Sequence, residues 1–98
     1  MAVPATGAAI NPSIEHAKAE YFIELNQALL TDLENQMSEF LALDTDLARA
    51  SAADIRVQIS ITKSLIGFWR NEASFWKSEI DENKKDISQT NKLAAGTG

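Results

Sequence analysis

The chain contains no cysteine and only one histidine, two prolines and four glycines among its 98 residues. The lack of cysteine excludes disulfides, thiolate metal sites and cysteine nucleophiles. No uncharged apolar stretch approaches the ~20 residues that a membrane-spanning helix requires, so we expect no stable membrane insertion. Residues 1–12 lack the basic region and apolar core of a cleavable Sec signal, so we expect a protein that is cytoplasmic or exported by a non-Sec route.

Basic residues are also fewer than acidic ones. The chain has 9 lysines and arginines and 14 aspartates and glutamates, which gives a net charge of −5. This balance argues against a general nucleic-acid binder, because phosphate contacts require a net basic surface. The hydrophobic share of 45% and the charged share of 23% are typical of a soluble chain that folds, and the length allows one small domain.

The sequence motifs that usually carry catalysis are absent. The sequence has no glycine-rich phosphate loop, no nucleophile elbow and no paired Cys/His ligand set. His16 lies near Glu15 and Glu20, but a metal there would need ligands from other chains. No glutamate stands three residues before His16, as a di-iron helical bundle would require. We therefore expect a protein that is not an enzyme, with no catalytic residue, metal or cofactor.

What the sequence does have is helical periodicity. Apolar residues from Phe22 to Phe40 recur at intervals of 3 and 4, as on one side of an α-helix. Asn11 followed by Pro12 suits a helix N-cap, and Ser13 is the competing cap. We predict a flexible arm over residues 1–12 and an acidic helix over residues 13–43.

The pattern loosens after this helix. Asp44 to Asp46 are poor residues for a helix interior, and Ser51 with Asp54 matches a capping box. We therefore predict a turn over residues 44–51, a second helix over 52–88 and a flexible tail over 89–98. Because the turn contains neither glycine nor proline, one bent continuous helix is the alternative. The favoured fold is all-α, a two-helix antiparallel hairpin with a coiled-coil-like second helix.

The second helix repeats every seven residues. Every seventh residue from Arg49 to Lys84 is basic. Two other columns of the same frame are largely apolar and take the a and d positions of a heptad repeat, which places the basic residues at e and an increasingly acidic column at g. The a column comprises Ala52, Ile59, Ile66, Ala73, Ile80 and Ile87, and the d column comprises Ile55, Thr62, Trp69, Trp76 and Asn83.

The c column widens the apolar side of this helix. It contains Ile61, Phe68 and Phe75, and with Leu65 it extends the apolar arc to about 160°, more than one partner helix covers. We therefore predict self-association into a bundle or larger homo-oligomer, or binding of another helical protein. The predicted interface residues are Ile59, Ile66, Phe68, Trp69, Phe75, Trp76 and Ile80.

Charges are expected to set the register of the helices. The acidic first helix can lie along the basic e column, and a parallel pairing of two second helices would instead join g to e′ positions, such as Glu79 to Lys84′. Both arrangements are compatible with a bundle. The predicted register-setting residues are Arg56, Lys63, Arg70, Glu72, Lys77, Glu79 and Lys84.

Part of the second helix resembles the subunits of type III secretion needles. The resemblance rests on Trp69-Arg70-Asn71, followed by Ser74, Ile80 and Ile87. Those proteins are short helical hairpins without cysteine that polymerise into a hollow filament. The resemblance implies that the first four of these residues pack or line a lumen and have no catalytic role. Unlike that family, this chain has no proline in the predicted turn and continues past the predicted second helix.

Together these features predict a non-enzymatic structural or assembly protein that associates through heptad-patterned helices, as a filament or shell subunit. The alternative is a small helical adaptor or secretion chaperone that acts as a defined dimer and binds a partner helix. A chaperone would stop at a fixed mass, whereas the mass of a filament subunit would grow with concentration.

Overall fold

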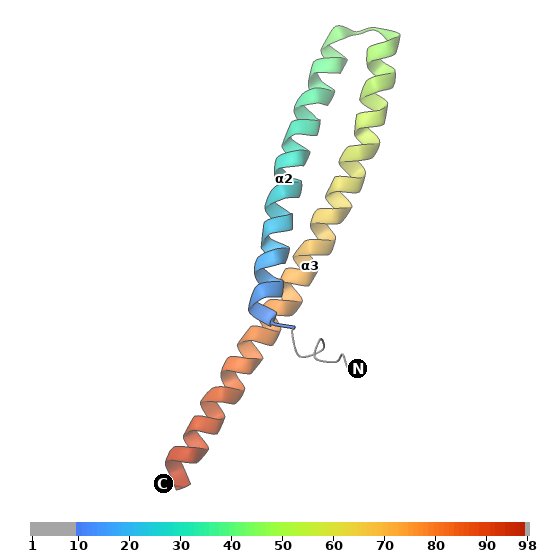
Figure 1. Cartoon of the computed structure of the whole chain (residues 1–98). Helices are drawn as coiled ribbons and strands as arrows, with labels where there is room; N and C mark the ends of the chain where they lie inside the picture. The colour runs from blue at the N-terminus through green and yellow to red at the C-terminus, as the bar shows by residue number, and fades with distance from the viewer. Residues whose placement is uncertain (1–9, 98) are drawn as a thin grey trace, which may run out of the picture.

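The computed structural model describes residues 10–97, with side chains for residues 10–86. The described chain forms two helices, α2 (Pro12–Leu43) and α3 (Asp46–Thr97), which pack side by side as an antiparallel hairpin (Figure 1). The all-α hairpin predicted from the sequence is therefore confirmed. The principal extents of 78 × 36 × 13 Å describe a long, thin molecule, and its radius of gyration of 22.2 Å exceeds the ~13 Å of a compact domain of similar length.

Helix α2 begins at the predicted cap. The Oδ1 atom of Asn11 accepts a hydrogen bond of 2.9 Å from the backbone N–H of Ser13, and Pro12 occupies the first helical position. This bond satisfies one of the backbone donors that a helix start leaves without a partner. Asn11 is thus the N-cap, and Ser13 lies inside the helix. Of the predicted flexible arm, residues 1–9 lie outside the described residues.

The turn between the helices is much shorter than the predicted 44–51. Asp44 adopts the left-handed conformation (φ 50°, ψ 45°) and donates its backbone N–H to the carbonyl of Leu41. Aspartate tolerates this conformation better than most residues, which is how the chain reverses without glycine. The hydroxyl of Thr45 then accepts the N–H of Ala48 at 3.1 Å and starts α3. The predicted cap at Ser51 is wrong, because Ser51 already lies within α3.

Arg49 bridges the two aspartates of this turn. Its guanidinium donates to the carboxylate of Asp44 at 2.7 Å and also to that of Asp46. Two acidic side chains that are unfavourable in a helix interior thus lie beside a cation at the helix start, where acidic groups are favourable. The same local bonding explains why the second helix begins at Asp46 and not at the predicted residue 52.

The core is the seam between the helices. One cluster joins Ala19 and Ile23 of α2 to Ala73 of α3, and another joins Leu33 to Ile55 and Ile59. On α3 the buried residues belong to the predicted a and d columns, so α2 covers the seam that the heptad pattern marks. They are Ala52, Ile55, Ile59, Thr62, Ile66 and Ala73, preceded by Ala48.

Helix α3 extends well beyond α2 (Figure 1). Phe22 lies against Trp69, and Leu33 clusters with Ile59, so residues that face each other have numbers that add up to about 91. Pro12, the first residue of α2, therefore lies opposite residue 79 or 80. We call residues 81–97 of α3 the overhang. It is helical through Thr97, where a flexible tail was predicted from residue 89, and at 1.5 Å per residue it is about 25 Å long.

Candidate assembly surface

A row of four aromatic rings crosses the hairpin from one helix to the other. Phe22 of α2 stacks on Trp69 of α3, with ring centroids 4.7 Å apart and planes at 23°. Tyr21 meets Phe22 edge-on at 5.5 Å, and Phe68 meets Trp69 edge-on at 5.0 Å. The two inner rings are half-buried, while Tyr21 is 57% and Phe68 51% exposed. The row therefore presents an aromatic surface to the outside of the hairpin.

Aliphatic side chains of α2 extend this surface along the first helix. Leu25 and Leu29 follow Phe22 by 3 and 7 residues, spacings that place them on the same side of an α-helix. Both are nearly half exposed, at 47% and 46%. Their neighbour Leu33, by contrast, turns into the core. The apolar series of α2 thus divides into a buried part and an exposed part.

The c and g columns extend the surface along α3. Leu65 precedes Trp69 by four residues, and Ile61 and Phe75 lie seven residues before and after Phe68. All three are exposed, with Phe75 at 54%. Phe75 also meets Trp76 edge-on at 4.9 Å. We call the surface that these exposed apolar residues form on one side of the hairpin the aromatic face, which comprises Tyr21, Leu25, Leu29, Ile61, Leu65, Phe68 and Phe75.

The hairpin leaves this face uncovered for a simple geometric reason. A helix with its side chains is about 10 to 12 Å across, so a molecule only 13 Å thick contains a single layer of helices. Each helix then has one neighbour, which covers only the stripe that faces it. The apolar arc of α3 is wider than that stripe, as the exposed rings of Phe68 and Phe75 demonstrate.

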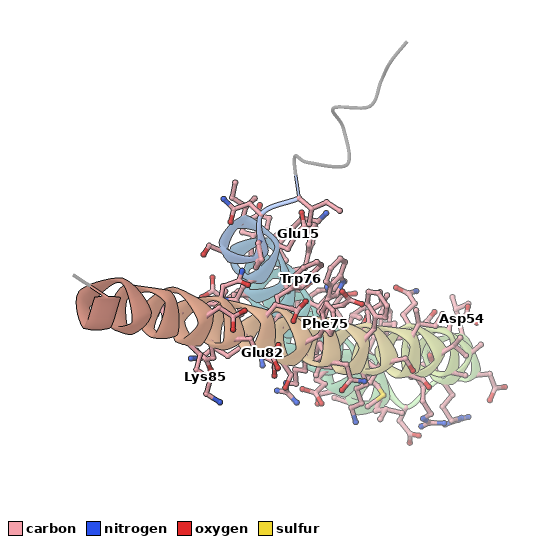
Figure 2. All side chains as sticks on the ribbon, turned by 90° about the horizontal axis from the view of Figure 1, so that it is seen from below. Glu15, Asp54, Phe75, Trp76, Glu82 and Lys85 are labelled. Atoms are coloured by element: carbon pink, nitrogen blue, oxygen red, sulfur yellow. The ribbon has the colours of Figure 1, made fainter. Side chains whose placement is uncertain are left out.

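The structure divides the predicted interface residues into three groups. Ile59 and Ile66 are buried against α2, at 7% and 5% exposure, so they hold the hairpin together. Phe68 and Phe75 lie on the open aromatic face. Trp69, Trp76 and Ile80 are half-buried. Figure 2 shows Trp76 on the side of α3 that lies toward the start of α2. The assignment of this set to an oligomer interface stays a prediction.

The predicted register-setting charges lie along the surface of α3. The five basic residues are exposed, and Glu72 and Glu79 are half-buried. Within residues 10–86, every ion pair joins groups no more than five positions apart, such as Lys77 with Asp81 at 3.3 Å, and none joins α2 to α3. The helices are therefore held together by apolar packing, and the role of these charges between copies stays a prediction.

A shallow groove opens beside the basic column, on the other side of the seam from the aromatic face. His16 lies in it, with Nε2 3.5 Å from Oε1 of Glu20. Within the described residues, no group of three or more His, Asp or Glu side chains is placed to hold a metal ion. The groove is lined by His16, Glu20, Ile23, Arg70, Ala73, Ser74 and Lys77.

Sequence reasoning missed the contribution of α2 to the aromatic face. The regular intervals from Phe22 to Phe40 indicated one buried side, yet the structure buries Ile23 and Leu33 and exposes Leu25 and Leu29. The available signal was the apolar pairs Phe22–Ile23 and Leu29–Leu30, because adjacent apolar residues diverge by about 100° around a helix. Such pairs mark an apolar arc wider than one contact stripe.

The residues that carry the resemblance to secretion needles differ in exposure. Arg70, Asn71 and Ser74 are exposed, Trp69 in the aromatic row and Ile80 are half-buried, and the side chain of Ile87 lies outside the described residues. Comparison with protein-family models, curated proteins and solved structures finds no match to this chain. In the part of the chain that the structure describes, neither helix has a stretch long and apolar enough to span a bilayer.

Proposed function

We propose that this protein is a non-enzymatic structural subunit that self-assembles by covering its aromatic face with the same face of a second copy. The observation that carries the proposal is the continuous row of rings from Tyr21 to Phe68, half-exposed at both ends in a fully formed hairpin. Large rigid aromatic side chains are the residues that contribute most to protein interfaces, because they bury much surface at little entropic cost.

The area of the face matches the requirement of a dimer. Taking about 200 Å² for each large side chain, the exposed fractions of the seven residues add up to about 700 Å² of apolar surface. A stable interface buries about 800 Å² per partner, so the face and its polar rim supply enough. The largest apolar patch of an ordinary monomer is about 300 to 600 Å², which makes this face large for a protein of this size.

The face is also suited to contact itself. Its α2 half is mainly aliphatic, with Leu25 and Leu29, and its α3 half is mainly aromatic, with Phe68 and Phe75. A two-fold axis that lies between the two faces and runs parallel to the helices places the aliphatic half of each copy against the aromatic half of the other. Leucine side chains then fill the spaces between rings.

Two copies in contact would form a bundle of four helices in two layers. The apolar core between the layers would be larger than the core of a single hairpin. A subunit that forms one closed contact would remain a dimer, as expected of an adaptor or secretion chaperone. A filament or shell subunit needs a further contact on another surface. We favour the filament or shell subunit, because the molecule is elongated and carries an unpaired helical overhang.

The test is the molar mass of the purified chain by light scattering over a thousandfold range of concentration. We expect the mass to rise from that of the monomer, 10.7 kDa, and to keep rising at the highest concentrations. A mass that stops at twice this value would favour the adaptor alternative. A mass that stays at 10.7 kDa throughout would overturn self-assembly. Electron microscopy of the concentrated sample would distinguish open fibres from closed particles.

A further inference from the structure

We infer that the hairpin has a second contact surface for its own copies, on the side of the seam opposite the aromatic face, where α2 of each copy lies along α3 of the other. The inference rests on the proposed self-assembly and supplies the further contact that growth beyond a dimer requires. We call this surface the charged face. It comprises Glu20, Glu24, Gln27 and Glu34 of α2 and Arg56, Lys63, Arg70 and Lys77 of α3.

The heptad frame places these residues on one side of the hairpin. On α3, the basic e column flanks the seam on one side, and the g and c columns of the aromatic face flank it on the other. On α2, Glu20 directly follows the buried Ala19, whereas Phe22 of the aromatic row directly precedes the buried Ile23. One step along a helix turns by about 100°, so the two side chains lie on opposite sides of the seam. The groove described above agrees, because Glu20 and Arg70 both line it.

The charges of this face have few partners within the hairpin. All the residues of the charged face are exposed. Within residues 10–86, Glu20 pairs with His16 and Lys77 with Asp81, each on its own helix, and the other charged residues of the face form no ion pair. An acidic row and a basic row thus lie side by side on the same face, and both are open to a partner.

The spacing of the two rows identifies a second copy as that partner. Residues that face each other across the hairpin have numbers that add up to about 91, so Glu20 lies level with Arg70, and Glu34 lies level with Arg56. A two-fold axis between two charged faces, parallel to the helices, keeps these levels and places α2 of each copy opposite α3 of the other. Glu20 then meets Arg70′, and Glu34 meets Arg56′.

The charges disfavour the other symmetric arrangement. A two-fold axis that crosses the helices would place α3 against α3′ and α2 against α2′, so basic side chains would face basic ones and acidic side chains would face acidic ones. Like charges in contact are unfavourable. An acidic helix of a different protein would pair with the basic row but would leave the acidic row of α2 without a partner. A second copy satisfies both rows.

This contact provides the growth step of the assembly. Exposed ion pairs contribute little individually, so we expect the charged face to associate at higher concentrations than the aromatic face. Each copy then has two neighbours, one on either side of its single layer of helices. Two parallel two-fold axes on opposite sides of a layer combine into a translation, so the copies stack in an open series and no ring closes.

Single cysteines test the arrangement directly, because the parent chain has none. Ala17 and Ser74 are exposed, lie one helical turn from Glu20 and Arg70 on the charged face, and have numbers that add up to 91. We would mix full-length Ala17→Cys and Ser74→Cys at high concentration, oxidise them mildly and identify the covalent dimers by mass spectrometry. Dimers with one copy of each variant should form at least fivefold more than dimers of either variant with itself.

The control exchanges the position of one cysteine for another on the same helix. Ser78 is also exposed but lies in the f column, away from the charged face. Ser78→Cys mixed with Ala17→Cys should give at least fivefold fewer mixed dimers than Ser74→Cys does. Equal yields from Ser74→Cys and Ser78→Cys would overturn the inference. A main product of Ser74→Cys with itself would also overturn it, because α3 would then lie against α3′.

Charge reversal tests the ion pairs themselves. In both cysteine variants, Arg70→Glu places an acid against Glu20′ and should reduce the yield of mixed dimers at least fivefold. The added exchange of Glu20→Arg restores opposite charges at this level and should restore the yield. Since both residues are exposed, circular dichroism of the dilute variants should match the parent. An unchanged yield with Arg70→Glu alone, or no recovery in the double exchange, would contradict the pairing.

The two proposals fail separately. If the mass of the parent chain stops at a dimer that Phe68→Ala prevents, and no mixed cross-link forms, the charged-face inference is wrong and self-assembly through the aromatic face stands. If mixed cross-links form while Phe68→Ala associates in the same way as the parent, the charged-face inference stands and the aromatic face is not the contact proposed above.

Discussion

Replacement of Phe68 by alanine tests the aromatic face at one of its exposed rings. Phe68 is 51% exposed, which leaves about 100 Å² of apolar surface for a partner to cover. At about 25 cal/mol per Å² this surface contributes about 2.5 kcal/mol. A symmetric dimer contains the residue twice, so Phe68→Ala should weaken dimerisation by about 5 kcal/mol, or a few thousandfold in Kd.

The same substitution should barely affect the hairpin. Within one chain Phe68 makes an edge contact with Trp69 at 5.0 Å, worth about 0.5 to 1.5 kcal/mol. Alanine has a higher helix propensity than phenylalanine, which offsets part of this loss. Circular dichroism of the variant should therefore show the helical content of the parent when both are dilute and monomeric. An association defect without a folding defect is the specific signature expected.

Sedimentation velocity over a dilution series provides the comparison. The matched control is Leu47→Ala, which also removes an exposed apolar side chain, 79% exposed, but at the start of α3 beside the turn and away from the aromatic face. We expect the control to follow the parent and Phe68→Ala to remain monomeric at concentrations where the parent associates. Identical profiles for the parent and Phe68→Ala would refute the reasoning.

Substitutions at three further positions test the hairpin itself by thermal unfolding of dilute samples. Ile66→Ala removes a side chain that is only 5% exposed, and it should lower the free energy of unfolding by about 2 to 5 kcal/mol. An unchanged free energy of unfolding would mean that Ile66 does not pack against α2. Asn11→Ala removes the cap of α2 and should cost about 1 kcal/mol, whereas Asn11→Asp should be neutral. Thr62→Val should be neutral or stabilising, because the buried hydroxyl bonds only to the carbonyl of Gln58 in its own helix and valine has the same shape; a loss above ~2 kcal/mol would contradict this.

The seam of the hairpin was readable from the sequence because heptad spacing is a property of the chain alone. The column of Ile59 and Ile66 repeats every seven residues, and an α-helix places such residues on one stripe whatever their partner is. The sequence could not reveal whether that stripe faces the same chain or another copy. The structure places it against α2, so Ile59 and Ile66 hold the hairpin together, while Phe68 and Phe75 of the predicted interface set stay exposed.

The ends of the helices were less predictable, since they depend on local bonds that compete closely. The pair Ser51 and Asp54 matched a capping box, but Asp44 in the left-handed conformation and the hydroxyl of Thr45 form the turn earlier. The exposure of the apolar residues of α2 could not be predicted from the sequence for a different reason. The intervals of Leu25 and Leu29 fit the same helical period as the core, and only the position of α3 decides which apolar residues are covered.

The most direct measurement of the central claim is acrylamide quenching of tryptophan fluorescence along a concentration series. The chain contains two tryptophans, Trp69 in the aromatic row and Trp76 beside Phe75, so the signal reports on the proposed contact. If a second copy covers the aromatic face, quenching should fall as the concentration rises, in step with the molar mass, and should stay high in Phe68→Ala. Quenching that is the same in dilute and concentrated samples would show that the face remains open to solvent.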